Sequence, residues 1–572
     1  MNKLKRALPE DVGVSPSKIE AFLDDAESRA IELHSFMIYR QQSVIAEGWW
    51  SPYRQDIPHM LHSATKSFLA VAVGLAIHEN YFGLHDKVVS FFPDHALPDS
   101  ESSKRAQNMT VEHLLTQTSG HGVGQSGGEW RNIEGSWVDK FFSTPLDHEP
   151  GSEFVYSSAT SFMLSAIITK TTSVPVRDFL EPRLFRPLGI KMLNWDDGPG
   201  GVNPGGNGIS CLSEDFLKLG ILHLQEGMWE GKQILPKEYV KASTTPQRGN
   251  PYGYHWWTLP NGAYQARGMF GQYVTVLPNH DAVVMVTGGV PQGAIALKEL
   301  ISQHFPSMFL PSVGLASKGN SPRSLPTRFR HLHLMLPLEN EPPESCLQNV
   351  ISKERFAAKR PNEDGVISFT LDFESGIGYS IFHLHDHRGF HQVLLGKGAG
   401  WWPCTTSLSG AKLHHGYEFA QSSVVSRGLW TSKDTFEMIF QFNETAFRDV
   451  ITVTFLDGGS AAKLDRRVNV NSFSRQRPTI WCSTLVRGDE LLPSSGLGSG
   501  HKITYSVASS TVGELLDNPE TRAILEQEVP AQLLADPRLE KARMYTFEMV
   551  GPRVKGMGED VLARIDAKLA AL

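Results

Sequence analysis

The sequence has few cysteines, no long apolar run and no excess of basic residues. Its four cysteines, at positions 211, 346, 404 and 482, show no CxxC spacing, which argues against a disulfide framework and a thiolate zinc site. The longest apolar stretch, residues 68–77, is shorter than the ~20 residues that cross a bilayer. A net charge of −7 without a basic stripe argues against nucleic acid as a partner. No apolar signal-peptide segment follows the basic N-terminus. We therefore expect a cytoplasmic protein that binds neither membranes nor nucleic acid.

A chain of 572 residues is too long for one ordinary core, which predicts two or three domains. Residues 1–311 mix helical and strand patterns and predict an α/β (α+β) domain. Residues 312–326, SVGLASKGNSPRSLP, have the composition of a linker. Short alternating segments in residues 327–490 predict an antiparallel β-barrel, lipocalin-like, or a sandwich. Residues 491–572 predict a helical C-terminal segment.

The motif S-x-x-K places a lysine amine one helical turn after a serine hydroxyl, where the amine can help to remove the hydroxyl proton. The motif occurs five times, starting at Ser15, Ser63, Ser409, Ser460 and Ser499. Only Ser63-Ala-Thr-Lys66 opens a long apolar segment, SFLAVAVGLAIHE, which predicts a buried helix. Ser63 is therefore the candidate nucleophile, and a plain helix N-cap is the alternative if the motif stands alone.

A second motif follows about ninety residues later, where PGSEFVYSS ends in Tyr156-Ser157-Ser158 before an apolar helical segment. This pairing, together with MTVEHLLTQTSG at 109–120, LFRPLGI at 184–190 and YGYHWW at 252–257, resembles class C β-lactamases and penicillin-binding proteins. It is also similar to family VIII esterases and 6-aminohexanoate-dimer hydrolases. The resemblance covers roughly residues 10–305.

The resemblance implies a two-lobed serine hydrolase domain with the nucleophile between the lobes. Ser63 would be acylated, and Lys66 and Tyr156 would manage its proton, with the identity of the base left open. The backbone N–H groups of Ser63 and Met269 would form the oxyanion hole. This chemistry requires no metal and no organic cofactor.

Two positions depart from the β-lactamase pattern. The segment Ala266-Arg267-Gly268 stands where lactamases have Lys-Thr-Gly, so the usual carboxylate-binding lysine is absent. Ser158 stands where lactamases have asparagine, and a hydroxyl makes a differently placed contact with a substrate amide. We expect Ser158, Ala266, Arg267, Gly268 and Gln272 to contribute to substrate binding, and these departures favour esters or unusual amides.

Other motifs have less specific interpretations. Gly124-Gln125-Ser126-Gly127-Gly128 matches G-x-S-x-G, but it lies in a glycine-rich segment, which predicts a loop near the mouth of the site. His62 precedes Ser63, and a packing or substrate-wall role is expected. Residues 198–208, GPGGVNPGGNG, lack the GK[ST] ending of a phosphate loop and predict a turn. A group of histidines has partial zinc-site spacing but is predicted to form a polar strand face instead: His383, His385, His387, His391, His414 and His415.

The sequence therefore predicts a serine hydrolase that cleaves a small ester or amide. One alternative is a penicillin-binding or sensor protein that is acylated without efficient turnover. A second is a β-lactamase or a peptidase similar to D-aminopeptidases. The added β domain leaves a binding role or an oligomer contact open.

Overall fold

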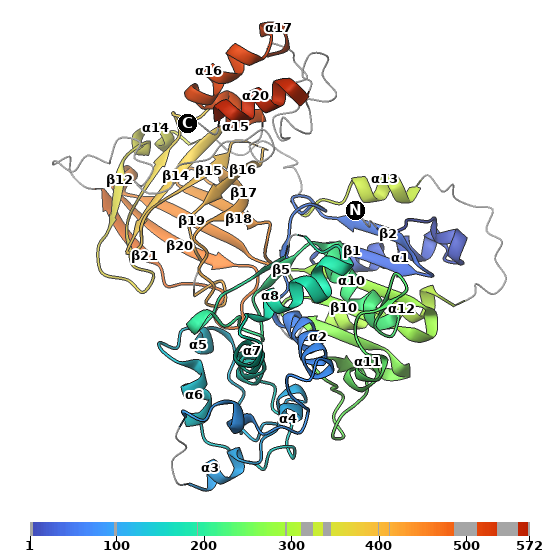
Figure 1. Ribbon diagram of the computed structural model, residues 1–572. Helices are drawn as coiled ribbons and strands as arrows, with labels where there is room; N and C mark the ends of the chain where they lie inside the picture. The colour runs from blue at the N-terminus through green and yellow to red at the C-terminus, as the bar shows by residue number, and fades with distance from the viewer. Residues whose placement is uncertain are drawn as a thin grey trace. The chain divides into compact units, whose positions relative to one another are not determined.

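The computed structural model describes residues 4–95, 100–191, 193–291, 295–310, 324–335, 345–398, 400–410, 412–484, 512–534 and 559–569. The chain forms two compact units, Met1–Leu485 and Val486–Leu572 (Figure 1). Residues 312–323 of the predicted linker lie outside the described residues, and helix α13 (Ser324–Arg330) follows them. The domain limits predicted from the sequence stay predictions.

A six-stranded antiparallel sheet forms the centre of the N-terminal region, residues 4–335. Its strand order is β2-β1-β11-β10-β9-β8. The strands are β1 (Leu33–Arg40), β2 (Ser43–Trp49), β8 (Trp257–Thr258), β9 (Tyr264–Gly268), β10 (Gln272–Leu277) and β11 (Ala282–Gly288). The predicted strand pair around the turn Pro278–His280 is confirmed as β10 and β11. Every residue of β11 is buried, which is expected for a strand covered on both faces.

Helices cover both faces of this sheet. Helices α1 (Pro16–Ser28) and α12 (Ile295–Met308) share one apolar core with β1 and β11. Helix α10 (Ser213–Leu224) packs against β10 and β11 through Gly220. A Cβ at Gly220 would lie 2.5 Å from Val274 and 2.6 Å from Val283, so the helix approaches the sheet closely only because glycine stands there.

The second lobe of the N-terminal region is helical. Helix α2 (Thr65–His78) is buried on nearly all sides, as predicted, and packs against α7 (Ser158–Thr172) and α8 (Val176–Leu180). The other helices of the region are α3 (Glu101–Ala106), α4 (Val111–Leu115), α5 (Gly127–Arg131), α6 (Trp137–Ser143), α9 (Arg186–Leu188) and α11 (Lys237–Ser243). Short strands lie at β3 (His59–Met60), β4 (Leu193–Trp195), β5 (Ile209–Cys211), β6 (Met228–Trp229) and β7 (Lys232–Gln233). A sheet lobe beside a helical lobe is the predicted β-lactamase-like arrangement.

Residues 355–484 form an antiparallel β-barrel, which decides between the two predicted architectures, barrel and sandwich. The sheet has ten strands in the order β15-β14-β13-β12-β21-β20-β19-β18-β17-β16, and an additional pairing of β15 with β17 closes it. The strands are β12 (Arg355–Ala358), β13 (Val366–Asp372), β14 (Tyr379–Asp386), β15 (Gly389–Gly396), β16 (Trp402–Thr406), β17 (Ser422–Trp430), β18 (Thr435–Phe442), β19 (Arg448–Leu456), β20 (Ala461–Val468) and β21 (Ile480–Thr484). Helix α14 (Leu347–Ile351) precedes them. Along β14 buried and half-buried residues alternate, because successive side chains face opposite sides of a strand.

The barrel is joined to the N-terminal region by apolar and polar contacts. Met60 and Phe270 belong to the same buried cluster as the barrel core. Glu32 on the N-terminal side forms an ion pair of 2.7 Å with Arg448 of β19. The Tyr53 hydroxyl donates a hydrogen bond of 2.6 Å to the backbone carbonyl of Thr445.

The second unit contains helices in its described residues. They are α15 (Val512–Asp517), α16 (Pro519–Glu528), α17 (Ala531–Leu534) and α20 (Glu559–Leu569). Leu515, Leu525 and Ile565 form its small apolar core. The helical character predicted for residues 491–572 is confirmed over these ranges. In the part of the chain that the structure describes, no helix is both long and apolar enough to span a bilayer.

The contact of Tyr53 with the barrel leads to a stability prediction. Its buried hydroxyl also accepts a hydrogen bond of 2.7 Å from the Gln441 side chain. Tyr53→Phe should therefore lower the free energy of unfolding by about 1–3 kcal/mol, because buried partners lose their hydrogen bonds. Urea unfolding measures this, with Tyr81→Phe at a 40% exposed position as the control. Equal losses in the two variants would contradict the role of this contact.

Candidate active site

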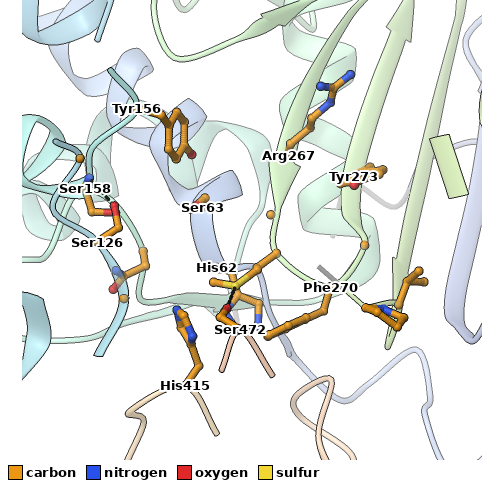
Figure 2. Close-up of a pocket in the computed structure, with 18 of the residues that line it drawn as sticks. His62, Ser63, Ser126, Tyr156, Ser158, Arg267, Phe270, Tyr273, His415 and Ser472 are labelled. Atoms are coloured by element: carbon orange, nitrogen blue, oxygen red, sulfur yellow. Dashed lines mark hydrogen bonds between the residues drawn. The ribbon is translucent and has the colours of Figure 1, made fainter. Parts of the chain in front are cut away.

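A cavity of about 510 Å³ lies where the two lobes of the N-terminal region meet the barrel. Figure 2 shows Ser63 inside it, with Tyr156 and Arg267 on one side and His415 and Ser472 on the other. The two lobes contribute Ser63, Tyr156, Ser158, Arg267, Gly268 and Met269, among others. The barrel contributes His415, Tyr417, Ser472 and Phe473.

Ser63 and Lys66 lie together as their spacing predicts. Ser63 belongs to the short turn His62–Ala64 directly before α2, and Lys66 is in the first turn of that helix. Lys66 Nζ donates to Ser63 Oγ at 3.3 Å. The ammonium group is fully buried, and burial lowers the pKa of Lys66 from 10.5 to about 7. A substantial fraction of this amine is therefore neutral at neutral pH and can accept a proton.

Tyr156 lies beside the same pair. Lys66 Nζ is 4.8 Å from the centre of the Tyr156 ring. Burial raises the pKa of Tyr156 to about 12, although its hydrogen bond with Ser63 and the charge of Arg267 oppose this shift. The phenol is therefore protonated at neutral pH and is able to donate a proton.

Ser158 connects Lys66 to the glycine-rich loop that contains Ser126. Lys66 Nζ donates to Ser158 Oγ at 3.2 Å, and Ser126 Oγ donates to the same atom at 3.1 Å. The Ser158 backbone N–H also donates to Ser126 Oγ at 2.9 Å. Ser126 is exposed and lines the cavity, as predicted for a loop at its mouth.

The turn at residues 198–208 has a role that its sequence did not reveal. The backbone carbonyl of Gly206 accepts a hydrogen bond of 2.8 Å from Lys66 Nζ. A Cβ at Gly205 would lie 2.6 Å from the Ser161 carbonyl, and one at Gly206 would lie 2.8 Å from Ser158 Cβ. The two glycines therefore allow the turn to approach α7, and this approach gives the lysine a backbone acceptor.

The end of β9 brings two backbone segments together beside Ser63. A Cβ at Gly268 would lie 2.0 Å from the Leu61 carbonyl, so only glycine permits this approach. Gln272 fixes the next segment, because its side-chain amide donates to the carbonyls of Met269 at 3.0 Å and Gly288 at 2.9 Å. Gln272 is fully buried and does not line the cavity described here, so its contacts position the turn and do not reach a ligand in that cavity.

The strand alternation in β9 separates Ala266 from Arg267. Ala266, expected to contribute to substrate binding, is fully buried in the apolar core and does not line the cavity. Arg267 lines it, with the guanidinium 5.2 Å from the Trp257 ring centre, and Lys298 of α12 lines the same wall. Burial lowers the pKa of Arg267 below its usual value. The cavity thus has cationic groups even though the lactamase lysine is absent.

The histidines with partial zinc-site spacing have separate partners. His391 contacts Asp386 at 2.9 Å, His414 contacts Asp449 at 2.6 Å, and the ring of His385 stacks on Phe390. Among the described residues, no group of three or more His, Cys, Asp or Glu side chains is arranged to hold a metal ion.

Comparisons with known proteins identify a family model, similar sequences and similar solved structures. The Beta-lactamase family model matches residues 19–298. The chain is 24% identical to the 6-aminohexanoate-dimer hydrolase of Paenarthrobacter ureafaciens, over 50% of this chain and 80% of that protein. It is 25% identical to the lovastatin esterase of Penicillium rubens, over 26% of this chain and 42% of that protein. The solved penicillin binding protein from Bacillus halodurans is 17% identical, covers 49% of this chain and 99% of its own, and gives a TM-score of 0.39.

These matches support the assignment of residues 19–298 to the serine β-lactamase and penicillin-binding protein superfamily, which the motifs predicted. Two of the similar proteins are named as hydrolytic enzymes, a 6-aminohexanoate-dimer hydrolase and a lovastatin esterase. Sequence reasoning did not place any barrel residue in the cavity, because no motif links residues 412–417 or 472–473 to Ser63. His415 was noted only as part of the histidine group.

The buried lysine predicts a pH dependence of stability. Between pH 7 and 10.5 the unfolded chain keeps a proton on Lys66 that the folded chain has released, so folded stability rises with pH in this window. Lys66→Met lacks this contribution. The unfolding free energy of the wild type relative to Lys66→Met should increase by up to about 1.4 kcal/mol per pH unit. Chemical denaturation at pH 7, 8, 9 and ~10 measures the difference, and a constant difference would contradict a lowered lysine pKa.

Proposed function

We propose that this protein is a serine hydrolase that cleaves a small ester or amide through an acyl-enzyme on Ser63. The observation that carries the proposal is the buried Lys66 amine, which contacts Ser63 Oγ at 3.3 Å and has a pKa of about 7. A neutral amine at this distance is a general base suited to a serine nucleophile. A plain N-cap serine would need no buried lysine beside it.

The two titratable partners divide the proton transfers. Lys66 takes the Ser63 proton as the oxygen attacks the substrate carbonyl carbon. Tyr156, whose pKa of about 12 keeps it protonated, donates to the leaving group, and Lys66 then returns its proton to the phenol. The same groups act in reverse order when water attacks the acyl-enzyme. One proton of the site leaves with the alcohol or amine product, and the attacking water restores it to Ser63 during deacylation.

The oxyanion formed in each step needs donors close to the reacting carbon. We assign this role to the backbone N–H groups of Ser63 and Met269, because Gly268 and Gln272 hold the Met269 segment against the Ser63 turn. Such a donor lowers the barrier by about 3 kcal/mol. Ser158 and Ser126 line the same cavity as Ser63, and their hydroxyls can contact the substrate.

The similar proteins support an acyl-transfer reaction, but their names point to different substrates. One is described as a 6-aminohexanoate-dimer hydrolase and another as a lovastatin esterase. Arg267 and Lys298 supply positive charge on one wall, and a carboxylated substrate would therefore be attracted to this chain despite Ala266. A panel of p-nitrophenyl esters, D-amino acid amides and nitrocefin separates esterase, peptidase and lactamase activity.

The first functional prediction concerns the nucleophile. Ser63→Ala should abolish hydrolysis and covalent labelling by a fluorophosphonate, since the Ser63 hydroxyl forms hydrogen bonds with both Lys66 and Tyr156. Ser126→Ala is the matched control, because Ser126 lines the same cavity and should leave labelling intact. Labelling that persists in Ser63→Ala and disappears in Ser126→Ala would reverse the assignment.

The second functional prediction concerns the proton donor. Tyr156→Phe keeps the ring and removes the hydroxyl, so kcat should fall at least about a hundredfold with little change in Tm. Near-normal kcat in Tyr156→Phe would mean that Lys66 acts without the phenol.

The same assay on the wild type separates an enzyme from a penicillin-binding protein. An enzyme shows steady turnover, whereas a penicillin-binding protein gives a single stoichiometric burst.

A further inference from the structure

One loop of the barrel, residues 412–417, lies against the cavity that contains Ser63. We call it the His415 loop. His414 Nε2 contacts Asp449 Oδ1 at 2.6 Å, and both side chains are buried. The His414 ring also stacks on Phe447 at 4.4 Å between centres. Asn471 donates to the carbonyl of Lys412 at 3.0 Å. These contacts fix the part of the loop that directly precedes His415.

The loop places the His415 side chain on the cavity wall. His415 has φ of 56°, a left-handed backbone conformation that is uncommon for a residue other than glycine. Its ring lies within 3.1 Å of the position that a Cβ on Gly127 would occupy, so it reaches the glycine-rich loop beside Ser126. Arg131 donates to the His415 carbonyl, and its guanidinium lies 3.9 Å from the Tyr417 ring centre. The N-terminal region therefore holds the loop from the opposite side.

Several buried polar atoms on this side of the cavity have no hydrogen-bond partner among the described residues. They are His62 Nδ1, His62 Nε2, His415 Nδ1 and Asn207 Oδ1. Their residues line the same cavity, and each is at most 5% exposed. A buried polar atom without a partner is destabilising, so four of them in one cavity indicate a place for a ligand or for water.

The electrostatic environment favours an uncharged ligand group. Burial holds the pKa of His415 at about 4 and that of His62 well below 6.5, so both imidazoles are neutral and each offers one N–H donor and one acceptor nitrogen. The positive charge of Arg131 interacts with the carboxyl group of Asp196, which is also buried near this wall. The two imidazoles thus provide donors and acceptors without carrying a charge themselves.

We propose that His415, together with His62 and Asn207, forms a subsite that binds an uncharged amide group of the substrate. An amide supplies both an N–H donor and a carbonyl acceptor, which is the combination that two neutral imidazoles and an asparagine oxygen can satisfy. The subsite rests on the proposed function, because it selects substrates for Ser63. It gives the barrel a direct part in specificity.

The test compares two esters that differ only in this amide. The probes are p-nitrophenyl N-acetyl-4-aminobutyrate and p-nitrophenyl heptanoate, whose acyl chains have equal length and whose leaving group is the same. The wild type should prefer the amide ester in kcat/KM. His415→Phe keeps an aromatic ring beside Phe473 but loses the hydrogen bonds, and should reduce this preference about tenfold.

Two further variants make the result specific. His415→Asn tolerates the left-handed backbone and retains a donor and an acceptor, so it should restore most of the preference. Lys412→Ala alters an exposed side chain of the same loop and should leave the preference unchanged.

A wild type that hydrolyses both esters equally, or a His415→Phe variant with an unchanged ratio, would overturn the subsite and leave the serine hydrolase intact. Equal hydrolysis would indicate that only water forms hydrogen bonds with the unpaired atoms of His62, His415 and Asn207. If neither ester acylates Ser63, the proposed function fails and the subsite fails with it.

Discussion

The burial of the Lys66 ammonium group is the constraint on which the site depends. A charged lysine is costly inside a protein, and its pKa falls unless an opposite charge lies nearby. Lys66 instead has three neutral oxygen acceptors, in Ser63, Ser158 and Gly206. These come from the turn before α2, the start of α7 and the glycine turn, so three segments must meet at one amine. Their convergence buries the Lys66 amine, and this burial lowers its pKa. The same contacts also set the position of Ser63.

The barrel completes the cavity that the two lobes begin. Phe270 and Met60 extend from the N-terminal region into the barrel core, and they place Met269 next to Ser472. The Ser472 hydroxyl contacts Met269 Sδ at 3.0 Å. Barrel packing and the geometry of the proposed oxyanion hole are therefore linked through adjacent residues. Substitutions in the barrel should therefore affect the proposed reaction at Ser63 through the Met269 segment and through the His415 loop.

Much of the candidate active site could be predicted from the sequence, because the signals for its residues are local. The spacing from Ser63 to Lys66 and the apolar helix after it fix their proximity, and the Tyr156 motif precedes a second buried helix. The Gly206 acceptor was missed because a turn gives no sign of which side chain its carbonyl will meet. The roles of Ala266 and Arg267 depend on which face of β9 meets the cavity, and alternation alone does not decide that.

The barrel strands were also visible in the sequence, since alternation along segments such as β14 is a local pattern. The closure of these strands into a barrel was not visible in the sequence. The pairing of β15 with β17 closes it, and only tertiary structure brings these two strands together. The approach of His415 to Ser63 is of the same kind, with about 350 residues between them in the chain. Long-range contacts of this sort leave no periodic signal.

The pH dependence of the acylation step tests the central claim most directly. Stopped-flow release of p-nitrophenol in the first turnover isolates the attack by Ser63 from later steps. If a neutral Lys66 amine is the base, the acylation rate should rise with pH and level off above an apparent pKa of about 7. A rate with no inflection between pH 5 and 9, or one that still rises steeply towards pH ~10, would contradict a neutral buried lysine as the base.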